Sequence, residues 1–113
     1  RQFYEWNPEV TLMRTTAEEN ARLGAIFAEK LNRASAPAHV LIPLKGFSIL
    51  DSPGDRFWNP EADAAFTHAL KAALRPGIPV EELDVNINDP AFAERATAVL
   101  FEMITRQGDK VTR

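Results

Sequence analysis

One run of residues, apolar at nearly every position, most constrains the fold of this chain. It spans about residues 38–44 and ends abruptly in Lys45, Gly46 and Ser48. A strand that faces water on one side alternates apolar with polar side chains, whereas a parallel strand covered by helices on both faces is apolar throughout. The run therefore predicts a central strand of an α/β sheet, followed by a polar segment of the kind that binds ligands at the end of such strands.

Segments with strand and helix periodicity alternate along the rest of the chain. Strand formers mark residues 10–13 and 80–87, and helical spacing of apolar side chains marks residues 17–33. Further helices are predicted from Pro60 to a stop near Pro76-Gly77, and from Pro90 to Gly108. The order β-α-β-α-β-α predicts a single domain, a three-layer α/β/α sandwich of Rossmann-like (flavodoxin-like) type with a small parallel sheet. Because three strands make an unusually small sheet, we expect further strands from an absent segment or a partner chain.

Local signals place the helix starts. Thr16 and Glu19 have the spacing of a capping box, in which each side chain binds a backbone amide near the other residue. Asn59 and Asp89 are good N-caps, and each is followed by a proline, which suits the first helical position. The segment from Lys45 to Asn59 shows neither period, and long loops in small domains are commonly functional, so we expect the ligand loop there.

Composition excludes several classes of function. The 113 residues are 45% hydrophobic, enough for a core, and 13 basic against 16 acidic residues do not predict nucleic-acid binding. The absence of cysteine removes disulfides and thiolate chemistry and fits a reducing compartment, and no apolar stretch is long enough to span a membrane. We expect a soluble, cytoplasmic protein. The aromatic start, with Phe3, Tyr4 and Trp6, suggests either a plug against the first strand or a piece of a longer protein.

Polar clusters follow each expected strand, and in a parallel sheet they would share one edge. The first cluster, Arg14-Thr15-Thr16, offers a cation and the start of a helix, which suit an anion. The second cluster, Lys45, Gly46 and Ser48, offers a lysine, a flexible glycine and a hydroxyl, which suit phosphate or carboxylate. The third brings amides and a carboxylate that suit a sugar or base. The candidate ligand residues are Arg14, Thr15, Thr16, Lys45, Gly46, Ser48, Asn86, Asn88 and Asp89. Neither a P-loop nor a dinucleotide-binding glycine pattern is present.

Structural roles remain open for the same residues. Capping alone explains Thr16 and Asp89, an ion pair explains Arg14, and a solvated turn explains Lys45. Carboxylates at Asp51 and Asp55 suit magnesium bound through water beside a phosphate, although turn chemistry explains them better. Asp84 is a candidate base or a partner for Lys45. Residues Phe57-Trp58 suit a loop latch or a base-stacking surface, and neither His39 nor His68 has a visible catalytic partner.

Separated motifs resemble one known family. They are Asn7-Pro8, Val10-Thr11-Leu12-Met13-Arg14-Thr15-Thr16, Leu41-Ile42-Pro43-Leu44-Lys45-Gly46 with Ser48, Asp51, Pro60-Glu61-Ala62-Asp63 and Asn86-Ile87-Asn88-Asp89-Pro90. Together they resemble the tomato-mosaic-virus-resistance type ATP-binding-domain family, many of whose microbial members are uncharacterised. The resemblance implies the C-terminal half of a longer protein, in which two Rossmann-like halves form a nucleotide-binding unit. The family pattern commonly has histidine where Asn86 stands, so the resemblance implies hydrogen bonding there rather than proton transfer.

Three hypotheses follow. The leading one is a half-domain that binds a nucleotide (ATP) or another phosphate ligand, with magnesium entering through the bound phosphate and the missing N-terminal domain supplying the other contacts. The second is an enzyme acting on a small phosphorylated or carboxylated metabolite, with Lys45 stabilising charge and Asp84 or Asp51 as base. The third is an interaction or homo-oligomerisation module that uses the aromatic start and an exposed sheet edge.

Overall fold

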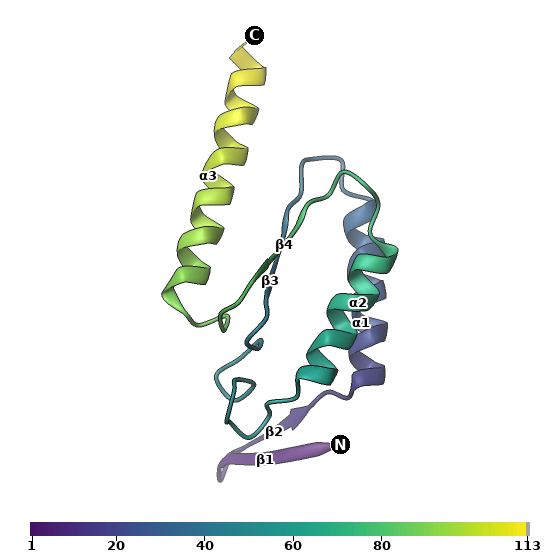
Figure 1. Ribbon diagram of the computed structural model, residues 1–113, viewed down its shortest axis with the longest axis vertical. Coiled ribbons are helices and arrows are strands. Elements are labelled where there is room, and N and C mark those ends of the chain that lie inside the picture. The colour runs from purple at the N-terminus through teal and green to yellow at the C-terminus, as the bar shows by residue number, and fades with distance from the viewer. Residues whose placement is uncertain (113) are drawn as a thin grey trace.

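The computed structural model describes the backbone of residues 1–112 and the side chains of residues 1–106. Strands and helices follow in the order β1, β2, α1, β3, α2, β4 and α3 (Figure 1). Their bounds are Gln2–Asn7 for β1, Val10–Arg14 for β2, Ala17–Asn32 for α1, Val40–Pro43 for β3, Pro60–Ala73 for α2, Val80–Leu83 for β4 and Pro90–Thr112 for α3. The chain is therefore an α/β protein, as its pattern predicts.

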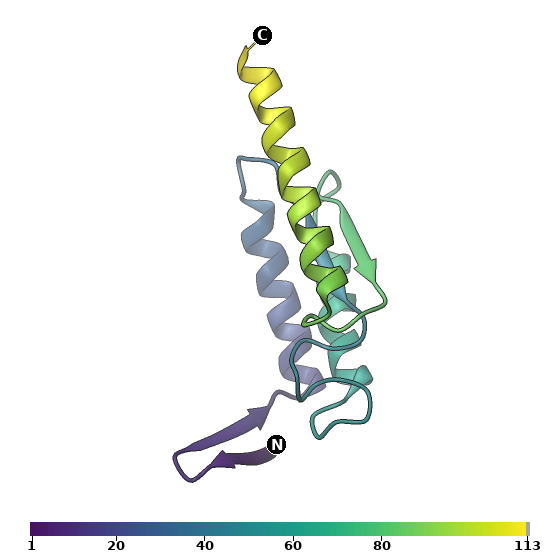
Figure 2. The ribbon, with the colours of Figure 1, turned by 90° about the vertical axis from the view of Figure 1, so that its left-hand side faces the viewer.

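The N-terminal strands form a hairpin of their own. β1 and β2 pair antiparallel, with Gln2 opposite Arg14 and Tyr4 opposite Leu12, and the turn contains Pro8. Figure 2 shows this hairpin projecting from the base of α1. The prediction that residues 10–13 join the strand at 38–44 in one sheet is wrong for the described chain, because β2 pairs with β1 instead. A short turn connects β1 to β2, so β1 is the strand nearest to β2 along the chain.

β3 and β4 form a parallel pair joined by α2. Val40 lies opposite Val80, and Pro43 opposite Leu83. The sheet has two strands within the described residues, so the three-strand sheet of the predicted sandwich is not seen there. β4 is also shorter than residues 80–87, because the amide of Val85 donates to the carbonyl of Leu83 (2.8 Å) in a tight turn that ends the strand.

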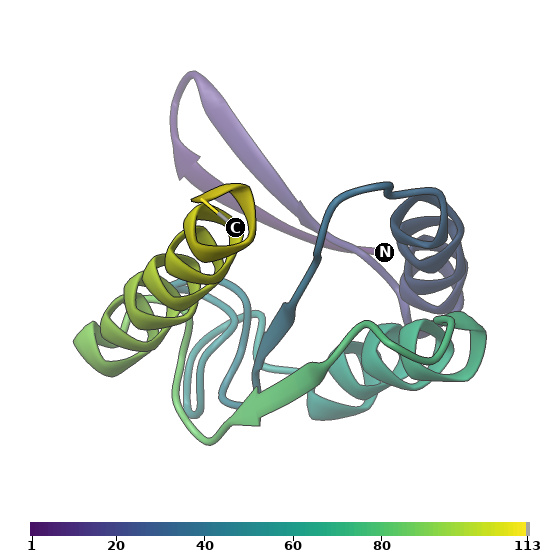
Figure 3. The same ribbon diagram turned by 90° about the horizontal axis from the view of Figure 1, so that it is seen from above.

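The core lies between the two N-terminal helices and β3. α1 and α2 pack along each other on one side of the β3–β4 pair, and α3 lies on the other side (Figure 3). The buried centre is formed by one residue from each packed element, namely Ala28, Ile42 and Leu70. Gly24 of α1 allows the close approach, since a Cβ there would lie 2.3 Å from the carbonyl oxygen of Phe66 in α2.

The predicted helix starts are confirmed. Thr16 Oγ1 accepts from the Glu19 amide (3.2 Å), and Glu19 Oε1 accepts from the Thr16 amide (2.9 Å), which completes the capping box of α1. Asn59 Oδ1 accepts from the Ala62 amide (3.0 Å) and caps α2. Asp89 Oδ1 accepts from the amide of Ala91 (2.9 Å) at the start of α3.

α3 differs from its prediction at the other end. The helix continues through Gly108 to Thr112, so the prediction that Gly108 ends it is wrong. A single glycine inside a helix costs only about 1 kcal/mol relative to alanine, too little to stop a long helix. Arg95 fixes α3 on β4 by donating from Nε and Nη2 to the Glu81 carboxylate (2.6 and 2.9 Å). Within the described residues no helix has the length and apolarity to cross a membrane.

Candidate functional site

Two loops leave the carboxyl ends of β3 and β4 and are tied together by backbone hydrogen bonds. The Lys45 amide donates to the Val85 carbonyl (3.0 Å), and the Ile87 amide donates to the Gly46 carbonyl (3.1 Å). The first loop covers residues 44–59 and carries no helix or strand, as the sequence predicts. This edge, which we call the rim, is where a parallel α/β sheet binds ligands.

Gly46 sets the path of the first loop. Its φ is +109°, a left-handed conformation, and a Cβ there would lie 1.6 Å from the carbonyl oxygen of Asp51. Only glycine accommodates both conditions. The loop therefore folds back on itself, with Asp51 against its own beginning.

Asn86 holds this folded loop in place. Its Nδ2 lies within hydrogen-bond distance of the carbonyls of Lys45 (3.0 Å), Ser48 (3.0 Å) and Asp51 (3.2 Å). Its Oδ1 accepts from the Asn88 amide (2.9 Å). The side chain is thus engaged with the protein at both ends, and Asn86 organises the rim.

Asp51 is the buried centre of the loop. The residue is 3% exposed, and its Oδ2 accepts from the Phe47 amide (3.0 Å). Its own amide donates to Ser48 Oγ (3.0 Å). These are contacts of an aspartate that stabilises a turn, which is the role that the sequence favours over a magnesium site.

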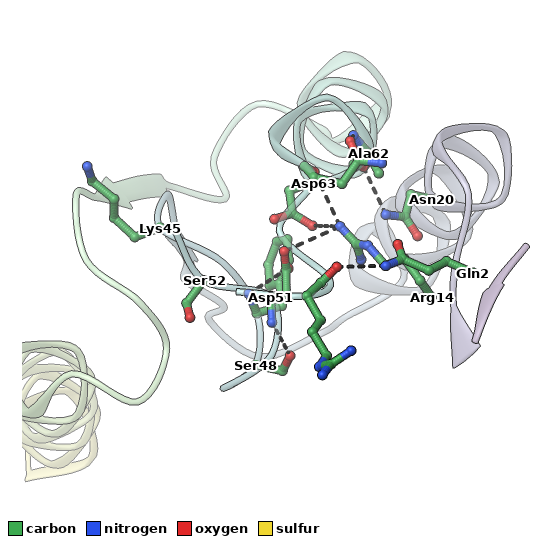
Figure 4. Close-up of polar contacts among 12 residues, drawn as sticks. Gln2, Arg14, Asn20, Lys45, Ser48, Asp51, Ser52, Ala62 and Asp63 are labelled. Atoms are coloured by element: carbon green, nitrogen blue, oxygen red, sulfur yellow. Dashed lines mark hydrogen bonds and ion pairs between the residues drawn. The ribbon is translucent and has the colours of Figure 1, made fainter. Parts of the chain in front are cut away.

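Arg14 lies inside the protein between two carboxylates. Its Nη2 donates to Asp63 Oδ1 (2.6 Å), and Asp51 Oδ1 lies 3.4 Å away (Figure 4). The Arg14 side chain is only 11% exposed. These three residues, the Arg14 cluster, tie the end of β2 to the rim loop and to the first turn of α2. The ion pair predicted as one role for Arg14 is therefore present, and the guanidinium that is also a candidate phosphate contact already faces two carboxylates.

The Arg14 cluster contains two acidic groups and only one basic group. Burial raises the pKa of Asp63 from 3.8 to about 7, the neighbouring Asp51 adds to the rise, and Arg14 opposes it. Asp63 Oδ2 and Arg14 Nε find no hydrogen-bond partner within the described side chains. With two carboxylates and one cation, the cluster accepts a proton near neutral pH.

Lys45 lies apart from Arg14. Figure 4 shows its side chain directed away from the Arg14 cluster. It is 47% exposed, and its Nζ lies 3.8 Å from Asp84 Oδ1, so the predicted pairing of Lys45 with Asp84 is present as a loose surface ion pair. The two cations expected to share an anion do not converge.

A cleft of about 760 Å³ opens between the hairpin and the rim loop. Its walls include Trp6 and Leu12 from the hairpin and Ser48 and Asn88 from the rim. Residues 48–50 all line the cleft, and within the described part of the chain their consecutive amides donate to no protein acceptor. Ser48 Oγ accepts a hydrogen bond from the backbone, which leaves its proton free to donate.

The nine predicted ligand residues are therefore divided. Ser48 and Asn88 line the rim cleft together, whereas Thr15 and Arg14 line a separate cleft beside α1. Helix capping accounts for the positions of Thr16 and Asp89. The folding of the rim loop accounts for Gly46 and Asn86. The side chain of Lys45 is half-exposed to solvent. No group of three or more His, Cys, Asp or Glu suited to a metal ion is found among the described residues.

Sequence reasoning missed Trp6 and Asp63. The sequence suggests that the aromatic start is a plug against the first strand or a piece of a longer protein, whereas Trp6 is 54% exposed and lines the rim cleft. The sequence does not reveal the burial of Asp63, because its partner Arg14 belongs to β2, far away along the chain. The unusual run of aromatic residues at the start was the available signal for Trp6.

Comparison with known proteins settles the family. The model of the Uncharacterised protein family (UPF0261) C-terminal domain matches residues 1–104. The chain belongs to this family. The resemblance predicted from the motifs is thereby confirmed, because two tomato relatives are the ToMV proteins described next.

Relatives of this UPF0261 C-terminal domain come from bacteria and plants. The UPF0261 protein RA0729 of Rhizobium meliloti (strain 1021) is 47% identical over 100 residues, which are 87% of this chain and 25% of that protein. In Solanum lycopersicum, the ToMV susceptible protein tm-1(GCR26) is 39% identical over 110 residues, covering 96% of this chain and 15% of the relative. The ToMV resistance protein Tm-1(GCR237) is 44% identical over 95 residues, 82% of this chain and 13% of the relative. The chain thus spans a quarter or less of these proteins.

Proposed function

We propose that this UPF0261 C-terminal domain forms one wall of a binding site for a phosphorylated ligand, a nucleotide such as ATP, at the rim. The observation that carries the proposal is the cleft of about 760 Å³, in which the Ser48 hydroxyl and the amides of residues 48–50 have hydrogen bonds left to donate. Consecutive backbone amides without acceptors suit the oxygens of a phosphate. Their place at the carboxyl ends of parallel strands fits the usual position of ligands in α/β proteins.

The opposite wall suits a base. Trp6 presents a half-exposed indole across the cleft from Ser48, and aromatic side chains stack on any nucleobase. Asn88 adds an amide to the same wall. A nucleotide therefore matches both the polar and the aromatic side of the cleft.

Magnesium would enter such a site with the phosphate. Asp51 is engaged by Arg14 and the Phe47 amide, and Asp55 is not among the residues that line the cleft. Magnesium commonly keeps its waters and binds through substrate phosphates, so this arrangement needs few protein carboxylates. In this proposal the chain is half of a Rossmann-like unit, and the remaining ligand contacts come from the rest of the protein.

The alternative of a metabolite-transforming enzyme has weaker support. Its candidate bases were Asp51, which is buried and paired, and Asp84, whose side chain is 78% exposed and next to Lys45. Neither residue is among those that line the rim cleft, so the binding function stands as the proposal.

Calorimetry on the full-length protein tests the proposal with ATP, ADP and inorganic phosphate as probes. We expect Trp6→Ala to weaken nucleotide binding by about tenfold, since stacking contributes about 1–3 kcal/mol per base. Ser48→Ala should weaken both nucleotide and phosphate binding by about three- to tenfold, through the lost hydrogen bond.

Matched variants separate these effects from general damage. Phe3→Ala removes an exposed aromatic side chain of β1 that is not among the residues lining the cleft, and Ser35→Ala removes an exposed hydroxyl far from the rim. Both should bind like the wild type. Equal affinities for Trp6→Ala, Ser48→Ala and the wild type, or no binding by the wild type, would overturn the proposal.

A further inference from the structure

One edge of β3 has backbone groups without partners. The Val40 amide donates to the Pro79 carbonyl (2.9 Å) and the Leu44 amide to the Leu83 carbonyl (2.8 Å), so these residues direct their backbone groups toward β4. Backbone groups alternate along a strand, and those of His39 and Leu41 therefore face the other edge. There the Leu41 amide has no acceptor among the residues that the structure describes.

The surroundings of this edge are apolar. A cleft of about 370 Å³ is lined by every residue of β3 and by none of β4, which places it on the unpaired side of the strand. Phe27 and Leu31 of α1 and Phe92 of α3 complete its walls. Figure 3 shows α1 and α3 on opposite sides of β3, as the two outer layers of an α/β sandwich would lie.

The same edge is only partly protected against pairing with another strand. Natural edge strands are guarded by charges, bulges or prolines. β3 contains no charged residue, and Pro43 removes only the last amide of the edge. Phe27, which lines the cleft, remains 51% exposed. An added strand would fill the cleft with its side chains and would also pair with the ladder groups of Leu41.

We propose that a β-strand from the part of the full-length protein outside this chain pairs in parallel with β3 at this edge, between α1 and α3. The chain covers only 25% of its Rhizobium relative, so ample sequence lies elsewhere in such proteins. We take the pairing as parallel because β3 and β4 are already parallel and helices lie on both sides of them (Figure 3), as in all-parallel sheets. With the added strand, β3 becomes a central strand, and the sheet with its helices on both sides forms a three-layer sandwich. This inference does not depend on which ligand the rim binds.

Single-residue hydrogen exchange in the full-length protein tests the pairing. The control is internal, because the amides of Val40 and Ile42 face β4 whereas that of Leu41 faces the proposed strand. We expect the protection of Leu41 to lie within about tenfold of that of Ile42, as in a strand paired on both edges. Exchange of Leu41 about a hundredfold or more faster than Ile42 would show an open edge and overturn the proposal.

Photo-crosslinking identifies the occupant. With p-benzoylphenylalanine in place of Phe27, we expect a crosslinked product of monomer mass, joined to a peptide outside residues 1–113. The same probe in place of Phe101, which is 71% exposed on α3, should not give that peptide. Crosslinks to β2, to a second copy of the protein, or to nothing would each contradict the assignment of the strand.

Discussion

Gly46 shows how one residue determines the form of the rim loop. We predict that Gly46→Ala destabilises the protein by about 3–5 kcal/mol, because a left-handed φ and a clash with the Asp51 carbonyl act together. Gly54→Ala is the matched control, since its φ is +85° but its Cβ would meet nothing within 4 Å. That control should cost only about 1–2 kcal/mol. Urea unfolding of the full-length variants measures both, and equal losses would contradict the role of the close approach.

Asp63 makes stability depend on pH in the direction opposite to an ordinary ion pair. Its pKa is about 7 in the folded chain and near 3.8 when unfolded, so between these values the folded state binds the proton more tightly. Stability is therefore lost as pH rises from about 4 to about 7, by up to about 1.4 kcal/mol per pH unit, and is constant above that range. The facing groups are Arg14, which limits the shift, and Asp51, which adds to it.

The variant Asp63→Asn tests this dependence, because an amide resembles the protonated acid. We predict that the melting temperature of the wild type falls relative to that of Asp63→Asn as pH rises from 5 to 8, with most of the change below about pH 7. Scanning calorimetry of both proteins across this range measures the difference. Parallel curves would show that Asp63 is ionised throughout, held by Arg14.

At the scale of elements, the α1–α2 contact depends on Gly24. Alanine is the better helix former by about 1 kcal/mol, so propensity alone predicts that Gly24→Ala stabilises the protein. We predict the reverse, a loss of about 2–4 kcal/mol, because the new Cβ would lie 2.3 Å from the Phe66 carbonyl oxygen and push the helices apart. Ala25→Gly, at an exposed position of the same helix, should lose only about 1 kcal/mol. Thermal unfolding distinguishes the two, and a stabilised Gly24→Ala would refute this packing.

The helix starts could be predicted from the sequence because their capping signals involve neighbouring residues. The caps at Thr16, Asn59 and Asp89 each involve residues two or three positions away, and each is present as predicted. Strand pairing was less predictable, because a short apolar run such as residues 10–13 fits any free edge, and the neighbouring β1 supplied one. Likewise, the glycine at position 108 resembles a stop signal but is tolerated inside α3.

For the whole molecule, the sequence predicted the α/β class and the position of the ligand loop better than the partners of its side chains. The sequence allows an ion pair for Arg14 as well as an anion contact, but it does not identify the partners, because Asp51 and Asp63 lie far away in sequence. No pattern near Arg14 reveals that β2 delivers it against α2. Trp6 and Ser48 likewise share a cleft only because the hairpin folds over the rim loop.

The parallel register of β3 and β4 also bears on the order in which this chain folds. Val40 meets Val80 only after α2 and both flanking loops have been enclosed, whereas Tyr4 meets Leu12 across a short turn. Closing the longer loop costs more conformational entropy before the contacts between β3 and β4 can offset that cost. Hairpins, in contrast, form in about 1–10 μs. The hairpin and the first two helices should therefore appear early on the folding pathway, and the sheet that carries the rim should form last.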